Sequence, residues 1–269
     1  MASSTKNVKL GVCKVFFDGN DLGYTKGGVE FSVATQTHRI EIDQFGKTAI
    51  NEYIMGRDAK VKVPLAETTL TNMAAMFPLR TGATGLEGTT TQRLGVDTGI
   101  GADLLSTAKL LSLHPVSKND YDFSDEVIIP LANTPGALQF AYQLENERIF
   151  NVEFTGYPDP VSSMLFYAGN PFTDATGKTF PVASGATTVL TVTGTLTAAM
   201  TGKMVVLGAT NATGAFPTGI VGRKLYFIKY ITATTCSVHP TYDDAVAGTN
   251  AVSVGTGSFV AGVSLALLS

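Results

Sequence analysis

The sequence is short of the residues that build most catalytic and metal sites. It contains no tryptophan, two cysteines and three histidines. Cys13 and Cys236 are far apart and form no CxxC pair, which argues against a zinc site or a disulfide-stapled secreted domain. We expect two free, mostly buried thiols. His38, His114 and His239 lack a second histidine at HxxxH or HExxH spacing, so we expect them to be structural.

Motifs for nucleophilic or phosphate chemistry are also missing. No GxSxG elbow occurs, and the segment Gly99-Ile100-Gly101 neither follows an apolar strand nor ends in GK[ST]. Asp120, Asp122, Asp125 and Glu126 form the densest acidic cluster, but they lack the spacing of a calcium loop, so we expect a solvated turn. The sequence therefore predicts no enzyme, no cofactor and no metal site.

Charge is scarce as well. Only 15% of residues are charged and the formal net charge is −3, with no basic block, which argues against tight binding to nucleic acid. The most apolar stretch, Phe259 to Leu268, is too short to span a bilayer, and the opening residues lack the pattern of a signal peptide. With 44% hydrophobic residues, the composition favours a protein whose surface is largely covered by copies of itself.

Glycine, proline and threonine are abundant and predict an all-β protein with little helix. The 28 Gly and 11 Pro suit many short strands joined by tight turns. Most acidic residues precede Pro171, and long runs of Thr, Ala, Val and Gly follow it. We therefore predict a domain of residues 1–170 and a small β-sandwich or barrel of residues 171–269.

Hydrophobic periodicity places the elements of the first domain. Residues 29–42 alternate as a strand with one buried face, and the alternation changes phase at residues 36–39, which predicts a bulge. Residues 58–65 predict a second strand and residues 67–77 a short helix ended by Pro78. Residues 79–101 show no period and are interpreted as a structureless assembly arm that orders on contact with a partner. Further strands are predicted at residues 108–113, 126–131, 138–144, 149–155, 188–192, 203–207, 224–230, 236–239 and 257–267.

An ordered series of segments resembles the tail tube (major tail) proteins of long-tailed bacteriophages. The series begins with KVFFDGNDLGYTKGGVEFS and continues with IDQFGKTAINEYIMGRDAKVKVPLAETTL. Its core is the Asp43-Gln44-Phe45-Gly46 turn, Ile54-Met55-Gly56 before a strand, and Ala66-Glu67-Thr68-Thr69-Leu70 at the start of the helix, within residues 12–157.

The resemblance implies a β-sandwich-like or barrel-like tube domain with one helix, six copies of which close into a ring. Stacked rings would form the hollow tube that conducts genome DNA from the head to the host. It implies partners among copies of the chain itself and other tail proteins, such as the tape measure, the terminator and the tip components. DNA would pass without specific binding. The implied location is the virion, after synthesis in the host cytoplasm, with no membrane insertion.

Two sets of residues are candidates for these roles. A lumen that conducts DNA should repel phosphate, so the lumen candidates are polar residues of the presumed inner strands: Glu30, Ser32, Gln36, Gln139, Gln143 and Glu145. The candidates for ring-to-ring contact lie in the arm: Arg80, Glu87, Arg93 and Asp97. The alternatives are that the first set faces solvent or a neighbouring subunit, and that the second lies in an ordinary surface loop.

The C-terminal part resembles small β-domains appended to virion proteins, through the segment GRKLYFIKYITATTCSVHPTYDDAVAG. Such domains are expected outside the tube, where Tyr226, Tyr230 and Tyr242 could stack on cell-surface glycans, or could belong to the core. Two other functions stay open: another ring-forming virion protein, such as a terminator, baseplate or decoration protein, and a carbohydrate-binding adhesion module.

Overall fold

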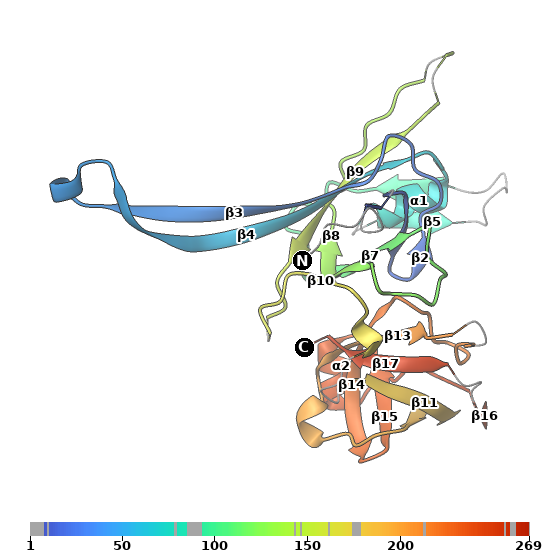
Figure 1. Ribbon diagram of the computed structural model, residues 1–269. Helices are drawn as coiled ribbons and strands as arrows, with labels where there is room; N and C mark the ends of the chain where they lie inside the picture. Colours follow the sequence, from blue (N-terminus) through green and yellow to red (C-terminus); the bar gives the residue numbers. More distant parts are fainter. Residues whose placement is uncertain are drawn as a thin grey trace. The chain divides into compact units, whose positions relative to one another are not determined.

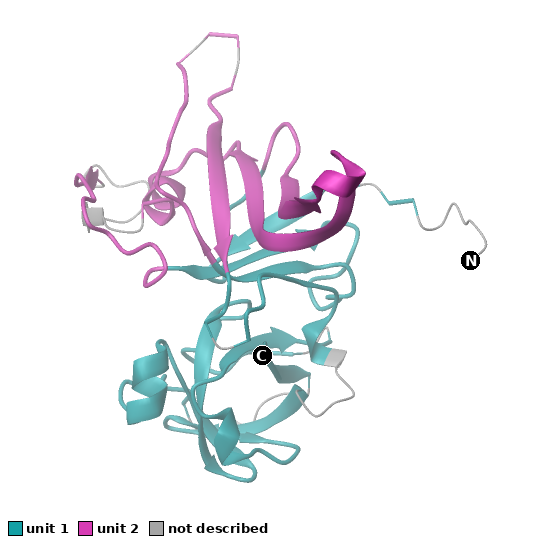
Figure 2. Ribbon diagram, turned by 90° about the vertical axis from the view of Figure 1, so that its left-hand side faces the viewer, with its two compact units in different colours: residues 1–24, 108–131, 158–269 teal, residues 25–107, 132–157 magenta. Residues whose placement is uncertain are grey.

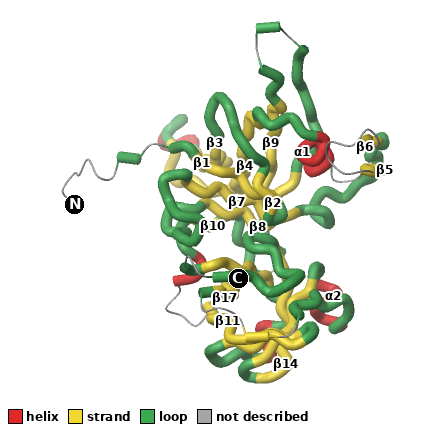
Figure 3. The backbone as a smooth tube through the Cα atoms, turned by 90° about the vertical axis from the view of Figure 1, so that its right-hand side faces the viewer, coloured by secondary structure: helices red, strands yellow, loops and turns green. Residues whose placement is uncertain are grey.

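The structure is a computed structural model that describes residues 8–9, 11–77, 80–84, 93–142, 144–145, 147–160, 162–173, 179–211, 214–255, 257–258 and 262–268. Strands dominate these residues, with two short α-helices among them (Figure 3). The all-β prediction is confirmed, although only one of the two helices was expected. Two compact units divide the chain, one of residues 1–24, 108–131 and 158–269, and the other of residues 25–107 and 132–157 (Figure 2). The domain boundary near residue 170 stays a prediction.

The second unit is built on three antiparallel strands in the order β9, β4, β3. Their bounds are β3 (Glu30–Glu41), β4 (Ala49–Leu65) and β9 (Phe150–Tyr157). The predicted alternation at residues 58–65 is confirmed, because Ala59, Val61, Val63 and Leu65 are buried while Lys60 and Lys62 are exposed. The buried apolar face stabilises the base of this sheet.

Helix α1 (Leu70–Ala75) confirms the predicted helix but is shorter. Thr69 is its N-cap, and the Thr69 hydroxyl accepts a hydrogen bond of 3.1 Å from the backbone N–H of Asn72. Because this side chain satisfies a free amide of the first turn, the helix begins at Leu70 and not at Glu67.

The prediction of a structureless arm at residues 79–101 is wrong for the described part of that segment. Strands β5 (Arg80–Thr84) and β6 (Arg93–Val96) pair antiparallel there, with Arg80 opposite Val96 and Thr84 opposite Arg93. Threonine and valine suit a strand even where hydrophobic periodicity is weak, and this local pairing gave no signal in the pattern.

The predicted strand at residues 138–144 is also wrong, because the described residues of that segment are irregular. The Arg148 guanidinium lies 5.4 Å from the ring centroid of Phe140, 5.6 Å from that of Tyr142 and 5.5 Å from that of Phe150. Arg148 also donates hydrogen bonds of 2.9 Å to the side chain and to the carbonyl of Thr68. The aromatic residues of the segment therefore surround a cation instead of alternating along a strand.

The first unit combines a small sheet with a closed barrel. The small sheet has the order β2, β1, β7, β8, with β10 also pairing with β8. Its bounds are β1 (Cys13–Phe17), β2 (Asn20–Asp21), β7 (Lys109–Pro115), β8 (Val127–Asn133) and β10 (Tyr167–Ala168). Strands β7 and β8 confirm the predictions at residues 108–113 and 126–131.

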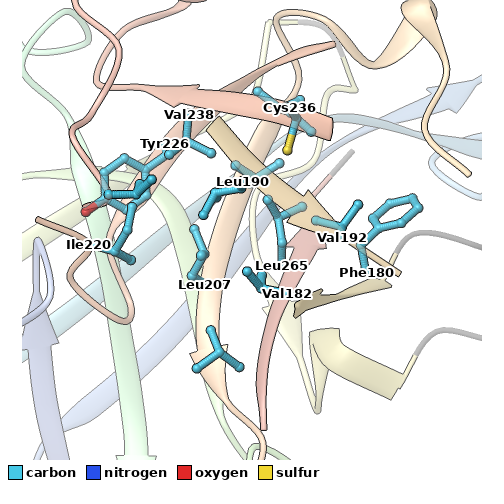
Figure 4. Close-up of a cluster of buried hydrophobic side chains, with 14 of the residues drawn as sticks. Phe180, Val182, Leu190, Val192, Leu207, Ile220, Tyr226, Cys236, Val238 and Leu265 are labelled. Carbon is cyan, nitrogen blue, oxygen red and sulfur yellow. The ribbon is translucent and has the colours of Figure 1, made fainter. Parts of the chain in front are cut away.

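The barrel follows the order β12, β15, β14, β13, β17, β11 and closes because β11 also pairs with β12. The strands are β11 (Thr179–Ala186), β12 (Val189–Val192), β13 (Met204–Ala209), β14 (Leu225–Thr232), β15 (Thr235–His239), β16 (Gly257–Ser258) and β17 (Val263–Leu267), and helix α2 (Tyr242–Ala247) contacts β14 and β15. Figure 4 shows Leu190, Leu207, Val238 and Leu265 in the core inside it. The small barrel was one of the two architectures predicted for this part of the chain.

A buried ion cluster ties the barrel to the small sheet within the first unit. Glu126 is fully buried and receives hydrogen bonds of 3.0 and 3.1 Å from Arg223, which precedes β14. Ser112 donates to the same carboxylate, and His114 Nδ1 lies 2.9 Å from it. The expectation of a solvated turn is therefore wrong for Glu126, whose charge needs these partners because burial removes its water.

Two aromatic rings flank the same arginine. The Arg223 guanidinium lies 4.7 Å from the ring centroid of Phe16 and 4.6 Å from that of Phe123. It also donates a hydrogen bond of 2.7 Å to the backbone carbonyl of Asp120. Arg223 therefore contacts the small sheet by charge, hydrogen bonding and stacking together.

Arg223→Met should lower the free energy of unfolding by about 3 kcal/mol, because it leaves the Glu126 carboxylate buried without its cation. Urea denaturation followed by circular dichroism measures this. Arg93→Met is the matched control, because Arg93 is exposed, and it should change the free energy by less than about 0.5 kcal/mol. Equal effects of the two substitutions would contradict the role of the cluster.

The cluster also predicts a dependence of stability on pH. Burial raises the pKa of Glu126, but hydrogen bonds from His114 and Arg223, the charge of Arg223 and the Ser112 hydroxyl outweigh burial and hold this pKa below the usual 4.5. A lowered pKa in the folded state contributes stability above pH 4.5, which is lost as the pH falls through the folded value. Below pH 4.5, the free energy of unfolding should therefore fall more steeply in the wild type than in Glu126→Gln. Parallel curves in an acid titration would rule this out.

Candidate assembly surface

The second unit carries a long two-stranded ribbon formed by β3 and β4. Strand β9 pairs with β4 only from Ala59 to Leu65, so residues 49–58 of β4 have β3 as their sole partner among the described strands. Figure 1 shows this ribbon extending far beyond β9. The 3-10 turn η2 (Asp43–Phe45) lies at its tip, where Gly46 has φ 61°, a conformation that glycine adopts without strain.

The predicted bulge lies in this ribbon and is confirmed. The pairing shifts between Gln36 and Thr37, because Gln36 is opposite Gly56 and Thr37 is opposite Ile54. Met55 is the extra residue, so the bulge lies in β4. The change in hydrophobic alternation that predicted it lies in the sequence of β3. A bulge bends the ribbon and increases its twist.

The predicted buried face of β3 is wrong, because most of the ribbon is exposed. In β3 only Phe31 and Ile40 are partly covered, and Val33 is exposed. The exposed apolar side chains of the ribbon and its tip are Val33 37%, Phe45 64%, Ile50 50%, Tyr53 57%, Ile54 59% and Met55 71%. A two-stranded ribbon has no third strand or second layer to cover such residues.

Both edges of the ribbon also lack a neighbouring strand among the described strands. β3 is the last strand of its sheet, and no described strand pairs with its outer edge. The distal half of β4 is equally open on its outer side over residues 49–58. Exposed edges of this length are templates for pairing with another chain.

One face of the sheet is polar across all three strands. The register places Glu30 opposite Lys62, Ser32 opposite Lys60, and Lys62 opposite Glu153, and residues opposite each other share a face. The predicted lumen residues Glu30, Ser32 and Gln36 therefore lie on one face, since they alternate along β3. Sequence reasoning missed that Lys60 and Lys62 of β4 lie on the same face, opposite Ser32 and Glu30.

A groove of about 500 Å³ lies on this polar face near the base of the sheet. Its walls include Lys26, Glu30, Lys62, Asn151 and Glu153. Lys26 is paired with Glu147. The groove is therefore lined by side chains of both signs.

The structure does not bring the other predicted lumen residues onto a strand of this sheet. Gln139 and Glu145 are exposed in the irregular segment between β8 and β9, and Gln143 lies outside the described residues. Of the contact candidates, Arg80 begins β5, Arg93 begins β6, and both Arg93 and Asp97 are exposed. Glu87 lies outside the described residues.

The tyrosines considered for glycan stacking do not share one environment. Tyr226 is buried in the barrel core, Tyr230 is partly buried, and Tyr242 is exposed on α2, where it packs against Phe227 edge to face. The core interpretation is therefore the right one for Tyr226.

The described residues contain neither a metal-binding cluster nor a membrane-spanning helix. They include no cluster of three or more His, Cys, Asp or Glu that could hold a metal ion. Within the described chain, no helix is long and apolar enough to cross a membrane. Cys13 and Cys236 are free, with Cys13 partly buried and Cys236 buried, as expected.

Comparisons with known proteins give no matching family model and a weak structural similarity. No family model matches the chain, and no curated protein matches it. A solved structure, that of the Dit protein (gp 19.1) of phage SPP1, is similar with a TM-score of 0.24 and 13% identity, over 95% of this chain and 98% of that chain. That protein is described as a paradigm of the hub adsorption apparatus in phages that infect Gram-positive bacteria.

Amide hydrogen exchange should separate the two halves of β4 while the protein is monomeric. Residues 49–58 should exchange faster than residues 59–65, because only the second set also pairs with β9 and has a buried face. Exchange measured by mass spectrometry on peptides from each half tests this. Equal protection of the halves would mean that the ribbon is stable without a partner.

Proposed function

We propose that the chain is a structural protein of a bacteriophage tail that binds copies of itself through the β3–β4 ribbon. In this proposal the copies close into a ring, six being the number that the sequence resemblance implies. Stacked rings form the tail tube, which conducts DNA from the head to the host. The role is structural and not catalytic.

The single observation that carries the proposal is the exposed ribbon. Residues 49–58 of β4 pair only with β3 among the described strands, and six apolar side chains of the ribbon and its tip are exposed. An isolated hairpin of this kind is at best marginally stable in water, so a partner that covers it would stabilise it.

A second copy of the chain fits the two free edges. The outer edge of β3 in one copy can pair with the outer edge of residues 49–58 in the next, because the edges lie on opposite sides of the same ribbon. Such a contact is head to tail, and head-to-tail contacts generate rings when the rotation closes. A ring leaves no ribbon edge unpaired, and this removes the risk of uncontrolled aggregation.

The low charge of the chain agrees with this proposal. Only 15% of residues are charged, which suits a surface that is covered on assembly. On one face of the sheet, the polar side chains of β3, β4 and β9 would then remain available to line the inside of the ring.

A double substitution in the ribbon tests the proposal. Ile54→Lys with Met55→Lys should abolish rings and tubes in negative-stain electron microscopy and leave monomers in analytical ultracentrifugation. Both side chains are exposed in the single chain, so the substitution should change its stability by less than about 0.5 kcal/mol.

Ile100→Lys with Leu144→Lys is the matched control. These side chains are also exposed and apolar but lie outside the ribbon. The control should assemble like the wild type. Wild-type protein that stays monomeric at every concentration, or ribbon variants that still form rings, would reject the proposal. Rings that never stack would support the proposed ring but contradict the proposed tube.

A further inference from the structure

The polar face of β3, β4 and β9 contains two lysines, and each has an acidic partner on the same face. Lys60 Nζ lies 2.7 Å from Glu153 Oε1, and Lys62 Nζ lies 3.5 Å from Glu30 Oε2. These four side chains are exposed, so the pairs face outward and not into a core. The third carboxylate of the face, Asp58, accepts a hydrogen bond of 3.0 Å from Gln36.

Lys60 remains charged in this arrangement. The hydrogen bond to Glu153 and the charge of Glu153 raise the pKa of Lys60. The same hydrogen bond and the charges of Lys60 and Lys62 lower the pKa of Glu153. Lys60 and Glu153 therefore stabilise each other's charged form, and their opposite charges offset each other as an ion pair.

We infer that Glu30 and Glu153 keep Lys62 and Lys60 from binding DNA, so that the polar face can lie against duplex DNA without holding it. The inference rests on the proposed function, which places DNA against this face. A free lysine gains affinity for DNA by neutralising a phosphate and releasing a counterion. A lysine already paired with a carboxylate on its own face gains less, because the carboxylate repels the phosphate and must lose its partner.

The pairing also explains why a face that conducts DNA can contain lysines. Two lysines without partners in each of several copies would make a ring of cations, and contacts of that kind slow or stop the passage of a polyanion. Paired with carboxylates, the same lysines keep the face hydrated and polar, with no net positive charge.

Replacing the two acids by amides tests the inference. Glu30→Gln with Glu153→Gln should leave the circular dichroism spectrum unchanged and should produce binding to a duplex of about 30 base pairs in fluorescence anisotropy at about 50 mM salt. Binding should weaken at least about tenfold when salt is raised to about 200 mM, as expected for two phosphate contacts in each bound copy. The wild type should show no binding under these conditions.

Two controls make the result specific. Adding Lys60→Gln and Lys62→Gln to the first variant should remove the gained binding. Asp103→Asn with Asp243→Asn removes the same amount of negative charge at exposed positions outside β3, β4 and β9, and it should not bind DNA. Equal binding by this control, no binding by Glu30→Gln with Glu153→Gln, or DNA binding by the wild type would overturn the inference.

The assay uses the full chain in whatever state of association it adopts, so its result is separate from that of the assembly test. Rings without a gain in DNA binding overturn the inference alone. A gain in DNA binding without rings overturns the proposed function and with it the lumen that the inference requires.

Discussion

A β-strand leaves a row of backbone amide and carbonyl groups on each side, and these groups need partners. The chain meets this constraint in two opposite ways. In the barrel, β11 pairs with β12 and closes the sheet, so each of the six strands has a neighbour on both sides. In the ribbon, β3 and the distal half of β4 pair only with each other among the described strands. In the barrel, the strand pairing is complete within one chain. In the ribbon, the outer strand edges are open to pairing with another chain.

A buried ion cluster, in addition to hydrophobic packing, joins the barrel to the small sheet within the first unit. Ser112 and His114 lie in β7 and Glu126 directly precedes β8, whereas Arg223 lies in the turn before β14. A buried charge is costly unless it is paired, so each member of the cluster specifies the position of the others. The directionality of the bidentate contact fixes how the barrel meets these strands.

On the ribbon, the same alternation that makes a strand also sorts its chemistry. Residues 59, 61, 63 and 65 of β4 face the core at the base, while Lys60 and Lys62 face outward with Glu30 and Glu153. The polar face is therefore built from three strands that come from two distant parts of the sequence. Its charge balance depends on the register between them, since a shift of one residue would move every side chain to the other face.

The sequence by itself determined the all-β class, the strand at residues 58–65, a short helix within residues 67–77 and a bulge near residues 36–39, because each depends on neighbours along the chain. It did not determine which strands are covered. Val33 looks like a core residue in the pattern but is exposed in the described part of the chain. Phe140 and Tyr142 suggested a strand, yet their rings surround Arg148. Glu126 looked like part of a solvated turn until the fold brought Arg223, which lies 97 positions later in the chain, to it. Periodicity records which residues could be buried, whereas only the tertiary structure decides what lies against them.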